Sequence, residues 1–354
     1  MICSHLNNGV FVDTSSRVTP CCYVRSNNRP EYKEIVTSDL HNHPVLKAIR
    51  RDVMNGITPP ECVGCKHSKG ITRKYSNDGI VTSETVQASD IEYLHVRFNN
   101  VCNFNCVMCN PSYSHLIHKE TYPNETPYVE MPVDHHAALI NDLPSMTGLK
   151  QIMLAGGEPF VIKNTVIEFL RQIPIKDVRV VSFTNGSRYD DELLDELETF
   201  SLAGLTCSID GMGDVFNYQR AGGDWDVVYE NIKKFSMRSN IKLHWSPTIT
   251  CLNLMQLPET IDEIDGYFAE SWFSNVLCDP EYYHIKMLKP EYLKQVRQHI
   301  QDQGLLKEID LAIDTEVDQS LIEQFWARAE YNLKHRGVDI QKLIPSISEI
   351  IREN

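Results

Sequence analysis

The stretch VRFNNVCNFNCVMCNP, residues 96–111, contains three closely spaced cysteines. Three residues separate Cys102 from Cys106, and two residues separate Cys106 from Cys109. Three thiolates in one short loop can bind three irons of a 4Fe–4S cluster and leave the fourth iron open to a non-protein ligand. Structural zinc sites usually have four protein ligands instead. A three-cysteine zinc or redox loop remains the alternative for the triplet alone.

A second set of cysteines lies in the first part of the chain. Cys62 and Cys65 form a Cys-x-x-Cys pair, a spacing at which both thiols can bind one metal. The segment FVDTSSRVTP is predicted to form a short hairpin that brings Cys3 near Cys21. These four cysteines could bind a closed 4Fe–4S cluster or a zinc ion. Adjacent cysteines seldom both bind one metal, so Cys22 is expected to be spare.

The composition is that of a globular protein with an acidic balance. The 354 residues are 42% hydrophobic and 23% charged, and 34 basic against 48 acidic residues give a net charge of −14. This charge disfavours a dominant nucleic-acid-binding surface. No apolar run approaches the roughly 18 residues that span a bilayer, and the N-terminus lacks the pattern of a secretory signal. We therefore expect a cytoplasmic protein, in which eleven cysteines favour metal ligands over disulfides.

Strands alternate with helices from residue 91 onward, which predicts βαβ units and a parallel sheet. The expected fold is α/β, with an open, partial (β/α)6 barrel over residues 91–285. A loop-rich module with a linker would precede it at 1–90, and a helical extension would follow it at 286–354. The predicted strands are residues 91–99, 151–155, 177–184, 203–210, 241–250 and 271–277.

Polar or glycine residues follow five consecutive predicted strands. The cysteine triplet follows the first strand, AGGEPF follows the second and TNG follows the third. The fourth strand ends in SIDG, and TCLN stands at the end of the fifth. Active residues of parallel barrels lie at the C-terminal ends of the strands. These loops are therefore expected to share one mouth.

These motifs, in this order and spacing, resemble the radical S-adenosylmethionine (radical SAM) superfamily. The motifs that carry the resemblance are Cys-x3-Cys-x2-Cys, Gly-Gly-Glu-Pro and Ser-Ile-Asp-Gly. An aromatic residue often precedes the last cysteine in this family, whereas Met108 stands there in this chain. A methionine can still line an adenine site through its backbone and its soft sulfur.

The resemblance implies a role for each matching residue. The triplet would hold a catalytic 4Fe–4S cluster, and SAM would chelate its open iron. The Gly-Gly-Glu segment would bind the amino group of SAM. The Ser and Asp of SIDG would bind the ribose hydroxyls, and the arginine that follows SIDG would bind the SAM carboxylate. An ordinary acidic residue at a helix start is the alternative for the glutamate, but the glycines before it favour the SAM role. The implied cofactor-binding residues are Met108, Gly156, Gly157, Glu158, Ser208, Asp210 and Arg220.

The N-terminal cysteine set resembles the auxiliary-cluster modules called SPASM or twitch. Such a module usually opens with a cysteine, a spacer, a glycine, four residues and a second cysteine, but Ser16 stands at the glycine position here. The module also usually follows the barrel, whereas this set precedes it. The cysteine count implies one auxiliary 4Fe–4S cluster. Its implied ligands are Cys3, Cys21, Cys62 and Cys65.

Three further residues are candidates for contact with a substrate. The strand 91–99 alternates, and its polar face, with His95 and Arg97, would point into the barrel. A satisfied internal polar network is the equally weighted alternative. Cys251 follows strand five and could donate a hydrogen atom to a substrate radical, although free cysteine is more often a small buried hydrophobic residue.

The resemblance predicts an enzyme that reductively cleaves SAM to methionine and a 5′-deoxyadenosyl radical, which abstracts a substrate hydrogen atom. By family analogy the SPASM-like module favours a peptide or protein substrate, followed by a small molecule or carbohydrate. A low-potential electron donor such as flavodoxin or ferredoxin is implied. A non-enzymatic zinc-binding scaffold protein is the alternative of another class.

Overall fold

The computed structural model describes residues 3, 5–14, 17–22, 24, 28–63, 81–273 and 275–352. Cys65 lies outside these residues. The chain divides into two compact units. Unit 1 comprises Met1–Cys102, Pro111–Phe183 and Asp190–Gly204, and unit 2 comprises Asn103–Asn110, Thr184–Tyr189 and Leu205–Asn354.

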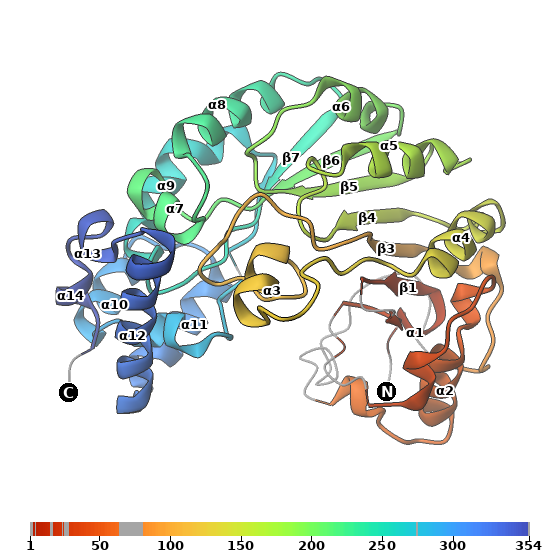
Figure 1. Cartoon of the computed structure of the whole chain (residues 1–354), viewed down its shortest axis with the longest axis horizontal. Coiled ribbons are helices and arrows are strands. Elements are labelled where there is room, and N and C mark those ends of the chain that lie inside the picture. Colours follow the sequence, from red (N-terminus) through yellow and green to blue (C-terminus); the bar gives the residue numbers. More distant parts are fainter. Residues whose placement is uncertain are drawn as a thin grey trace. The chain divides into compact units, whose positions relative to one another are not determined.

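The strands form one sheet of eight, in the order β2-β1-β3-β4-β5-β6-β7-β8 (Figure 1). The predicted α/β class, with a mostly parallel sheet and a helical C-terminal region, is confirmed. Two of these strands come from the first 90 residues, where the sequence predicted a hairpin, and they extend the sheet beyond the six strands predicted for the barrel. The strands are β1 (Gly9–Val12), β2 (Val18–Thr19), β3 (Tyr93–Arg97), β4 (Gln151–Ala155), β5 (Arg179–Thr184), β6 (Leu202–Cys207), β7 (Ile241–Trp245) and β8 (Glu270–Ser271).

Unit 1 is built around the parallel strands β1, β3, β4 and β5. Strand β3 alternates as predicted, because Leu94 and Val96 are buried whereas the side chains between them keep some exposure. Figure 1 shows α5 and α6 side by side along this part of the sheet, joined by an ion pair of Arg171 with Glu196 at 3.0 Å. The helices of unit 1 after β3 are α3 (His115–Thr121), α4 (Val133–Asp142), α5 (Lys163–Gln172) and α6 (Asp191–Glu198).

The N-terminal part of unit 1 contains the predicted hairpin. Strands β1 and β2 pair antiparallel, with Phe11 opposite Thr19. The helices here are α1 (His5–Asn8) and α2 (Pro44–Met54). The side chain of His43 caps α2, since its Nδ1 accepts a hydrogen bond from the backbone of Val45 at 3.3 Å. The chain leaves α2 through Gly56, whose positive φ of 74° suits a residue without a side chain.

Unit 2 holds β7, β8 and the remaining helices. Strand β7 ends at Trp245, although a strand was predicted up to residue 250. Strand β8 (Glu270–Ser271) shares only Ser271 with the strand predicted at 271–277. Pro247 cannot donate a ladder hydrogen bond, which explains the early end of β7. The helices are α7 (Gly213–Gln219), α8 (Trp225–Ser236), α9 (Leu257–Ile264), α10 (Pro290–Arg297), α11 (Gln303–Asp314), α12 (Gln319–Arg336), α13 (Ile340–Leu343) and α14 (Ile347–Ile350).

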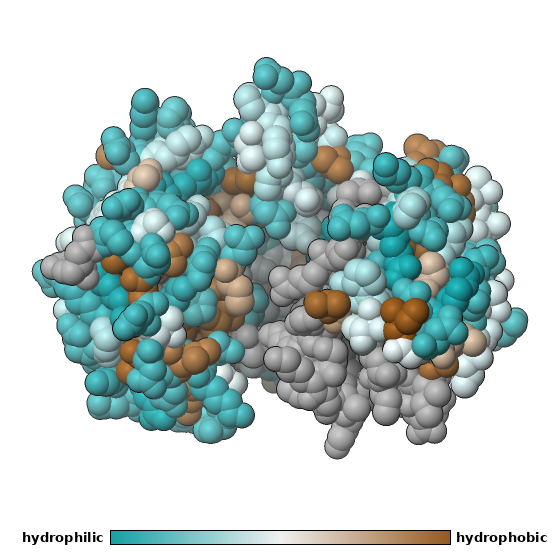
Figure 2. Space-filling model, turned by 90° about the horizontal axis from the view of Figure 1, so that it is seen from below, coloured by the Kyte–Doolittle hydropathy of each residue, from teal (hydrophilic) through white to brown (hydrophobic). Residues whose placement is uncertain are grey.

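The exposed apolar side chains are spread over several elements. Val133, Met237 and Leu311 are among the most exposed of them. The face drawn in Figure 2 is mainly hydrophilic, with separate apolar patches. Within the described residues, no helix combines the length and the apolar character needed to cross a membrane.

Candidate active site

The beginning of the cysteine loop packs against the glycine pair that follows β4, all within unit 1. The backbone N–H of Gly157 donates to the carbonyl of Asn99 at 3.0 Å, and that of Glu158 donates to the carbonyl of Val101 at 2.7 Å. A Cβ atom on Gly157 would lie 2.0 Å from the Val101 oxygen. Gly156 has a φ of 136°. The glycines therefore let two strand-end loops touch through their backbones, immediately before Cys102.

Glu158 is buried in this contact. Its Oε1 accepts a hydrogen bond from the backbone N–H of Phe160 at 3.2 Å. The carboxylate is thereby oriented by the turn that follows β4. This arrangement fits the simpler role of a turn-capping acid and also leaves a carboxylate beside the cysteine loop, so its contact with SAM stays a prediction.

Two residues of unit 1 that sequence reasoning missed hold the same loop. Asn100 is fully buried, and its side chain binds the backbone of Pro111, Pro127 and Val129 at 2.9–3.2 Å. The Nδ1 atom of His115 accepts a hydrogen bond from the backbone N–H of Cys102 at 3.2 Å. Burial lowers the pKa of His115, which keeps Nδ1 unprotonated and able to accept.

Unit 2 brings Cys106 together with the SIDG strand end. Arg220 lies with Nη1 3.9 Å from the Sγ of Cys106, and its Nε donates to Asp210 Oδ2 at 2.6 Å. The other carboxylate oxygen of Asp210 accepts from the backbone N–H of Thr248 at 2.7 Å. Asp210 is fully buried. The aspartate therefore fixes the guanidinium beside the thiol, with both of its oxygens occupied.

The backbone of the cysteine loop is fixed in unit 2 as well. The N–H of Asn105 donates to the carbonyl of Ala221 at 2.7 Å, and the N–H of Val107 donates to the carbonyl of Gln219 at 2.9 Å. The TNG loop contributes Asn185, whose Nδ2 donates to the Oδ1 of Asn103 at 3.0 Å. The predicted grouping of strand-end motifs around the cysteines thus holds for SIDG and TNG in unit 2 and for AGGEP in unit 1.

The thiols of Cys106 and Cys109 are weakly acidic in this environment. Burial raises the pKa of Cys106, and burial together with the charge of Cys106 raises the pKa of Cys109 to about 12. Arg220 opposes both shifts, because its positive charge favours the thiolate. A metal would have to displace both protons when it binds.

The thiol chemistry and the spacing of Cys102, Cys106 and Cys109 suit a 4Fe–4S cluster with one open iron. Among the residues that the structure describes, no three His, Cys, Asp or Glu side chains are already gathered as for a metal ion. The assignment of the triplet therefore rests on residue type, spacing and the cationic neighbour Arg220.

The other predicted residues occupy varied positions. Met108 and Ser208 are partly exposed. Cys251 is fully buried, and burial raises the pKa of its thiol, which keeps the S–H intact but away from solvent; its role as a hydrogen-atom donor stays a prediction. Cys3, Cys21 and Cys62 are partly exposed in unit 1. His95 and Arg97 share the partly exposed face of β3.

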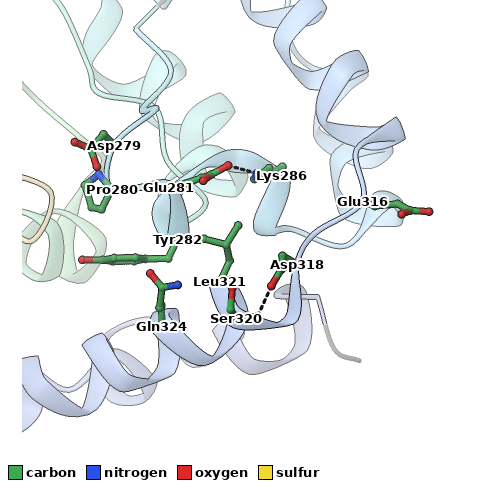
Figure 3. A pocket seen from close by; sticks show the side chains of 10 residues that line it. All are labelled: Asp279, Pro280, Glu281, Tyr282, Lys286, Glu316, Asp318, Ser320, Leu321 and Gln324. Atoms are coloured by element: carbon green, nitrogen blue, oxygen red, sulfur yellow. Dashed lines mark hydrogen bonds and ion pairs between the residues drawn. The ribbon is translucent and has the colours of Figure 1, made fainter. Parts of the chain in front are cut away.

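An open pocket of about 510 Å³ lies in unit 2, away from the predicted motifs (Figure 3). Two of its carboxylates have structural partners, because Glu281 pairs with Lys286 and Asp318 accepts from the backbone N–H of Ser320 at 2.8 Å. Asp318 thereby caps α12. These acidic residues are explained by helix capping and ion pairing.

Residues 96–269 match the Radical SAM superfamily. The chain contains a radical SAM domain. The matched segment includes the cysteine triplet, the Gly-Gly-Glu-Pro motif and the Ser-Ile-Asp-Gly motif. The prediction of a radical SAM enzyme is confirmed at the level of this domain.

Curated relatives share part of the radical SAM domain. A GTP 3′,8-cyclase from Syntrophomonas wolfei subsp. wolfei is 31% identical over 149 residues, which are 41% of this chain and 42% of the relative. An AdoMet-dependent heme synthase from Methanosarcina barkeri is 30% identical over 163 residues, which are 46% of this chain and 43% of the relative. The chain spans less than half the length of each of these relatives.

A solved structure with a similar fold is Streptococcus suis SuiB bound to precursor peptide SuiA. It is 12% identical, with a TM-score of 0.41 over 82% of this chain and 70% of that chain. A similarity of this size carries no inference about the substrate.

Proposed function

We propose that this protein cleaves SAM reductively at a 4Fe–4S cluster held by Cys102, Cys106 and Cys109. When bound, the cluster would supply the electron that converts SAM to methionine and a 5′-deoxyadenosyl radical, which abstracts a hydrogen atom from a substrate. The observation that carries the proposal is Arg220, which Asp210 holds 3.9 Å from the Cys106 thiol. A buried guanidinium at that position suits both a thiolate and the carboxylate of SAM.

The remaining residues of the site have positioning roles in this proposal. Gly156 and Gly157 admit the backbone contact that orders the loop before Cys102, and their carbonyl oxygens would be the backbone acceptors for the SAM amino group. Glu158 would add a carboxylate for the ammonium. Ser208 is the partly exposed hydroxyl offered to the ribose, whereas Asp210 acts mainly through Arg220.

Two substrate classes enter the proposal. The curated relatives named above, a GTP 3′,8-cyclase and a heme synthase, favour a small molecule. Modification of a peptide or protein rests only on the resemblance of the N-terminal cysteines to SPASM or twitch modules. We therefore rank a small-molecule substrate first, in contrast to the order expected from sequence alone.

The proposal also includes a second 4Fe–4S cluster bound by Cys3, Cys21, Cys62 and Cys65, and a low-potential donor such as flavodoxin or ferredoxin. The first three of these cysteines lie in the same unit. The donor follows from the chemistry, since SAM cleavage at a 4Fe–4S cluster consumes one electron.

Anaerobic reconstitution of the full chain tests the proposal. About eight irons per chain and reductive release of 5′-deoxyadenosine are expected, as two 4Fe–4S clusters would give. The Cys106→Ala variant should lose about half of the iron and the release of 5′-deoxyadenosine. The matched control is Cys278→Ser, because Cys278 is exposed and outside both cysteine sets. Stoichiometric zinc without SAM cleavage in the wild type would instead establish the scaffold alternative.

A further inference from the structure

One face of β3 is lined by side chains that are only partly covered. Tyr93, His95 and Arg97 keep some exposure there, whereas the residues between them are buried on the opposite face. The neighbouring strands place Phe11 opposite His95 from β1 and Met153 opposite it from β4. A cavity of about 60 Å³ lies on this face, lined in part by Phe11, His95 and Met153.

Arg97 is held at the end of this face by two aromatic rings. Its guanidinium carbon lies 4.9 Å from the ring centre of Phe11 and 4.3 Å from that of Tyr113. Both distances are within the range of cation–π contacts, which attract the charge and use none of the N–H donors in hydrogen bonds. No described residue accepts a hydrogen bond from Arg97 or forms an ion pair with it. Contacts with the two rings thus explain the position of the guanidinium, but no described residue uses its N–H donors.

The surroundings of Arg97 favour a ligand over a second protein partner. Ala155 stands opposite Arg97 on β4, so the cross-strand neighbour of the arginine is a methyl group that can neither accept a hydrogen bond nor compensate the charge. The Nε2 atom of His95 is enclosed and has no hydrogen-bond partner among the described residues. Burial and the charge of Arg97 lower the pKa of His95 to about 3, so the ring is neutral at physiological pH. Among the described residues, neither the N–H donors of Arg97 nor the Nε2 atom of His95 has a hydrogen-bond partner, and the two side chains share one face with apolar neighbours.

We propose that Arg97 binds an anionic group of the substrate, a carboxylate or a phosphate, while His95 hydrogen-bonds a polar atom of its body against Phe11 and Met153. The planar guanidinium matches either anion with two parallel N–H bonds, which a lysine cannot reproduce. The inference rests on the proposed function, because it assigns this face of the sheet to the substrate of the radical SAM domain.

Calorimetric titration of the reconstituted full chain with two probes tests the inference. Inorganic pyrophosphate represents phosphate ligands, and benzoate represents a carboxylate on a flat apolar body. The wild type should bind at least one probe, and the probe that binds identifies the anion. Arg97→Gln should weaken that binding about tenfold or more, since hydrogen bonds to charged groups contribute roughly 1.5–3 kcal/mol. The affinity of Arg97→Lys for that probe should lie between the affinities of the wild type and Arg97→Gln.

The matched control is Arg51→Gln, which removes an exposed arginine of the same unit that pairs with Glu84. It should bind the probe as the wild type does. Circular dichroism checks each variant, and if Arg97→Gln does not fold, Arg97→Lys decides the comparison. Equal affinity of wild type and Arg97 variants, or no binding of either probe by the wild type, would overturn the inference. Release of 5′-deoxyadenosine by the wild type is measured separately, so failure of the proposed function is distinguished from failure of this assignment.

Discussion

Gly157 illustrates how one residue without a side chain determines a contact of the candidate site. An added Cβ would meet both the carbonyl oxygen and the carbonyl carbon of Val101, at 2.0 and 2.4 Å. Backbone cannot move aside as a flexible side chain can, so the loop before Cys102 would have to shift. The motif predicted a functional glycine here, and the structure supplies a steric reason for it.

Gly157→Ala should therefore lower both stability and iron content. We expect a loss of about 2 kcal/mol or more in the free energy of unfolding, because the substitution strains a buried backbone contact. Chemical denaturation and iron analysis after reconstitution measure the two effects. Gly266→Ala is the matched control, since a Cβ at Gly266 meets nothing within 4 Å. A Gly157→Ala variant with wild-type stability would refute the steric explanation.

Asp210 and Arg220 form a second residue-scale test. Asp210→Asn should destabilise the protein by about 3 kcal/mol, because it leaves the enclosed Arg220 cation without its compensating charge. The double variant Asp210→Asn with Arg220→Met should be less destabilised than the sum of the two single variants. Urea denaturation of all four proteins gives the coupling energy. Strict additivity would show that the pair is not coupled.

The residues that could be predicted at this scale are those within compact motifs. The triplet and the Gly-Gly-Glu segment are recognisable because their spacing is local. Asn100 and His115 could not be assigned in the same way, because the partners of Asn100 lie at Pro111, Pro127 and Val129, and nothing in the sequence indicates that this segment folds back. Ser114 caps α3 through its side chain, a local signal that sequence reasoning did not use.

At the scale of elements, regular hydrophobic periodicity predicted strands and helices well. The strand predicted at 151–155 corresponds to β4, and helices such as α8 (Trp225–Ser236) stand between strands as the predicted alternation requires. The short helices α3 and α7, of seven residues each, were not predicted. Such short helices carry too few turns for an apolar stripe to stand out. Their positions are determined by contacts with the cysteine loop, which periodicity does not encode.

His43 makes the stability of the N-terminal elements dependent on pH. Its Nδ1 accepts from the Val45 backbone while its Nε2 bonds the Glu34 carbonyl at 3.0 Å, so the neutral ring caps α2. Burial, and to a smaller extent Lys47, lowers the pKa of His43, and burial lowers the pKa of the neighbouring His135 to about 4. The unfolded chain binds protons first as the pH falls, so this stability is present above pH 6.5 and is lost below it.

We expect the free energy of unfolding to fall between pH 7 and pH 5, with His135 contributing about 2 kcal/mol of the loss and His43 adding to it in the same direction. His43→Asn should reduce this slope, because an asparagine oxygen can cap the helix without titrating. Urea denaturation across this range measures the slope. His299→Gln, at an exposed histidine, should leave it unchanged. A His43→Asn variant with the full wild-type slope would contradict the assignment.

Helix α12 connects the C-terminal extension to the cysteine loop within unit 2. Asn332 donates to the hydroxyls of Tyr218 and Tyr283 at 3.1 and 3.2 Å, and Arg336 donates to the carbonyl of Asn105 at 3.2 Å. Asn105 directly precedes Cys106. The extension is therefore part of the support for the predicted cluster ligands and does more than cover the domain.

Arg336→Gln should accelerate the loss of iron from the reconstituted protein to a chelator by about tenfold, because a charged hydrogen bond to the loop is removed. The rate of iron transfer to ferrozine measures this effect. Lys334→Gln changes an exposed cation on the same helix and should have no effect. Equal rates for both variants would mean that α12 does not stabilise the loop.

At the scale of the whole molecule, the fold class was predictable from strand–helix alternation, but the edge of the sheet was not. Residues 1–90 were expected to form a separate module, and this domain boundary stays a prediction. The pairing of β1 with β3 joins Phe11 to His95, and no local pattern indicates such a distant partner. Hydrophobic runs of four residues such as GVFV predict a strand without naming its neighbour.

The iron content of the whole chain tests the auxiliary site. Cys62→Ser should remove about four of the expected eight irons. Cys22→Ser, at the exposed neighbour of Cys21, should keep them. Iron and sulfide analysis with Mössbauer spectroscopy distinguishes the two clusters. Full iron content in Cys62→Ser would exclude Cys62 as a ligand.

The parallel pairing of β1 with β3 has a consequence for synthesis. Residues Gly9–Val12 leave the ribosome early, yet their parallel neighbour Tyr93–Arg97 emerges only after the intervening segment has been translated. Closing so long a loop is entropically unfavourable until the later strand is present. Until then, the backbone N–H and C=O groups on one edge of β1 lack their partners in β3. A pause in translation before residue 93 would prolong the interval in which chaperones or other chains can bind that edge.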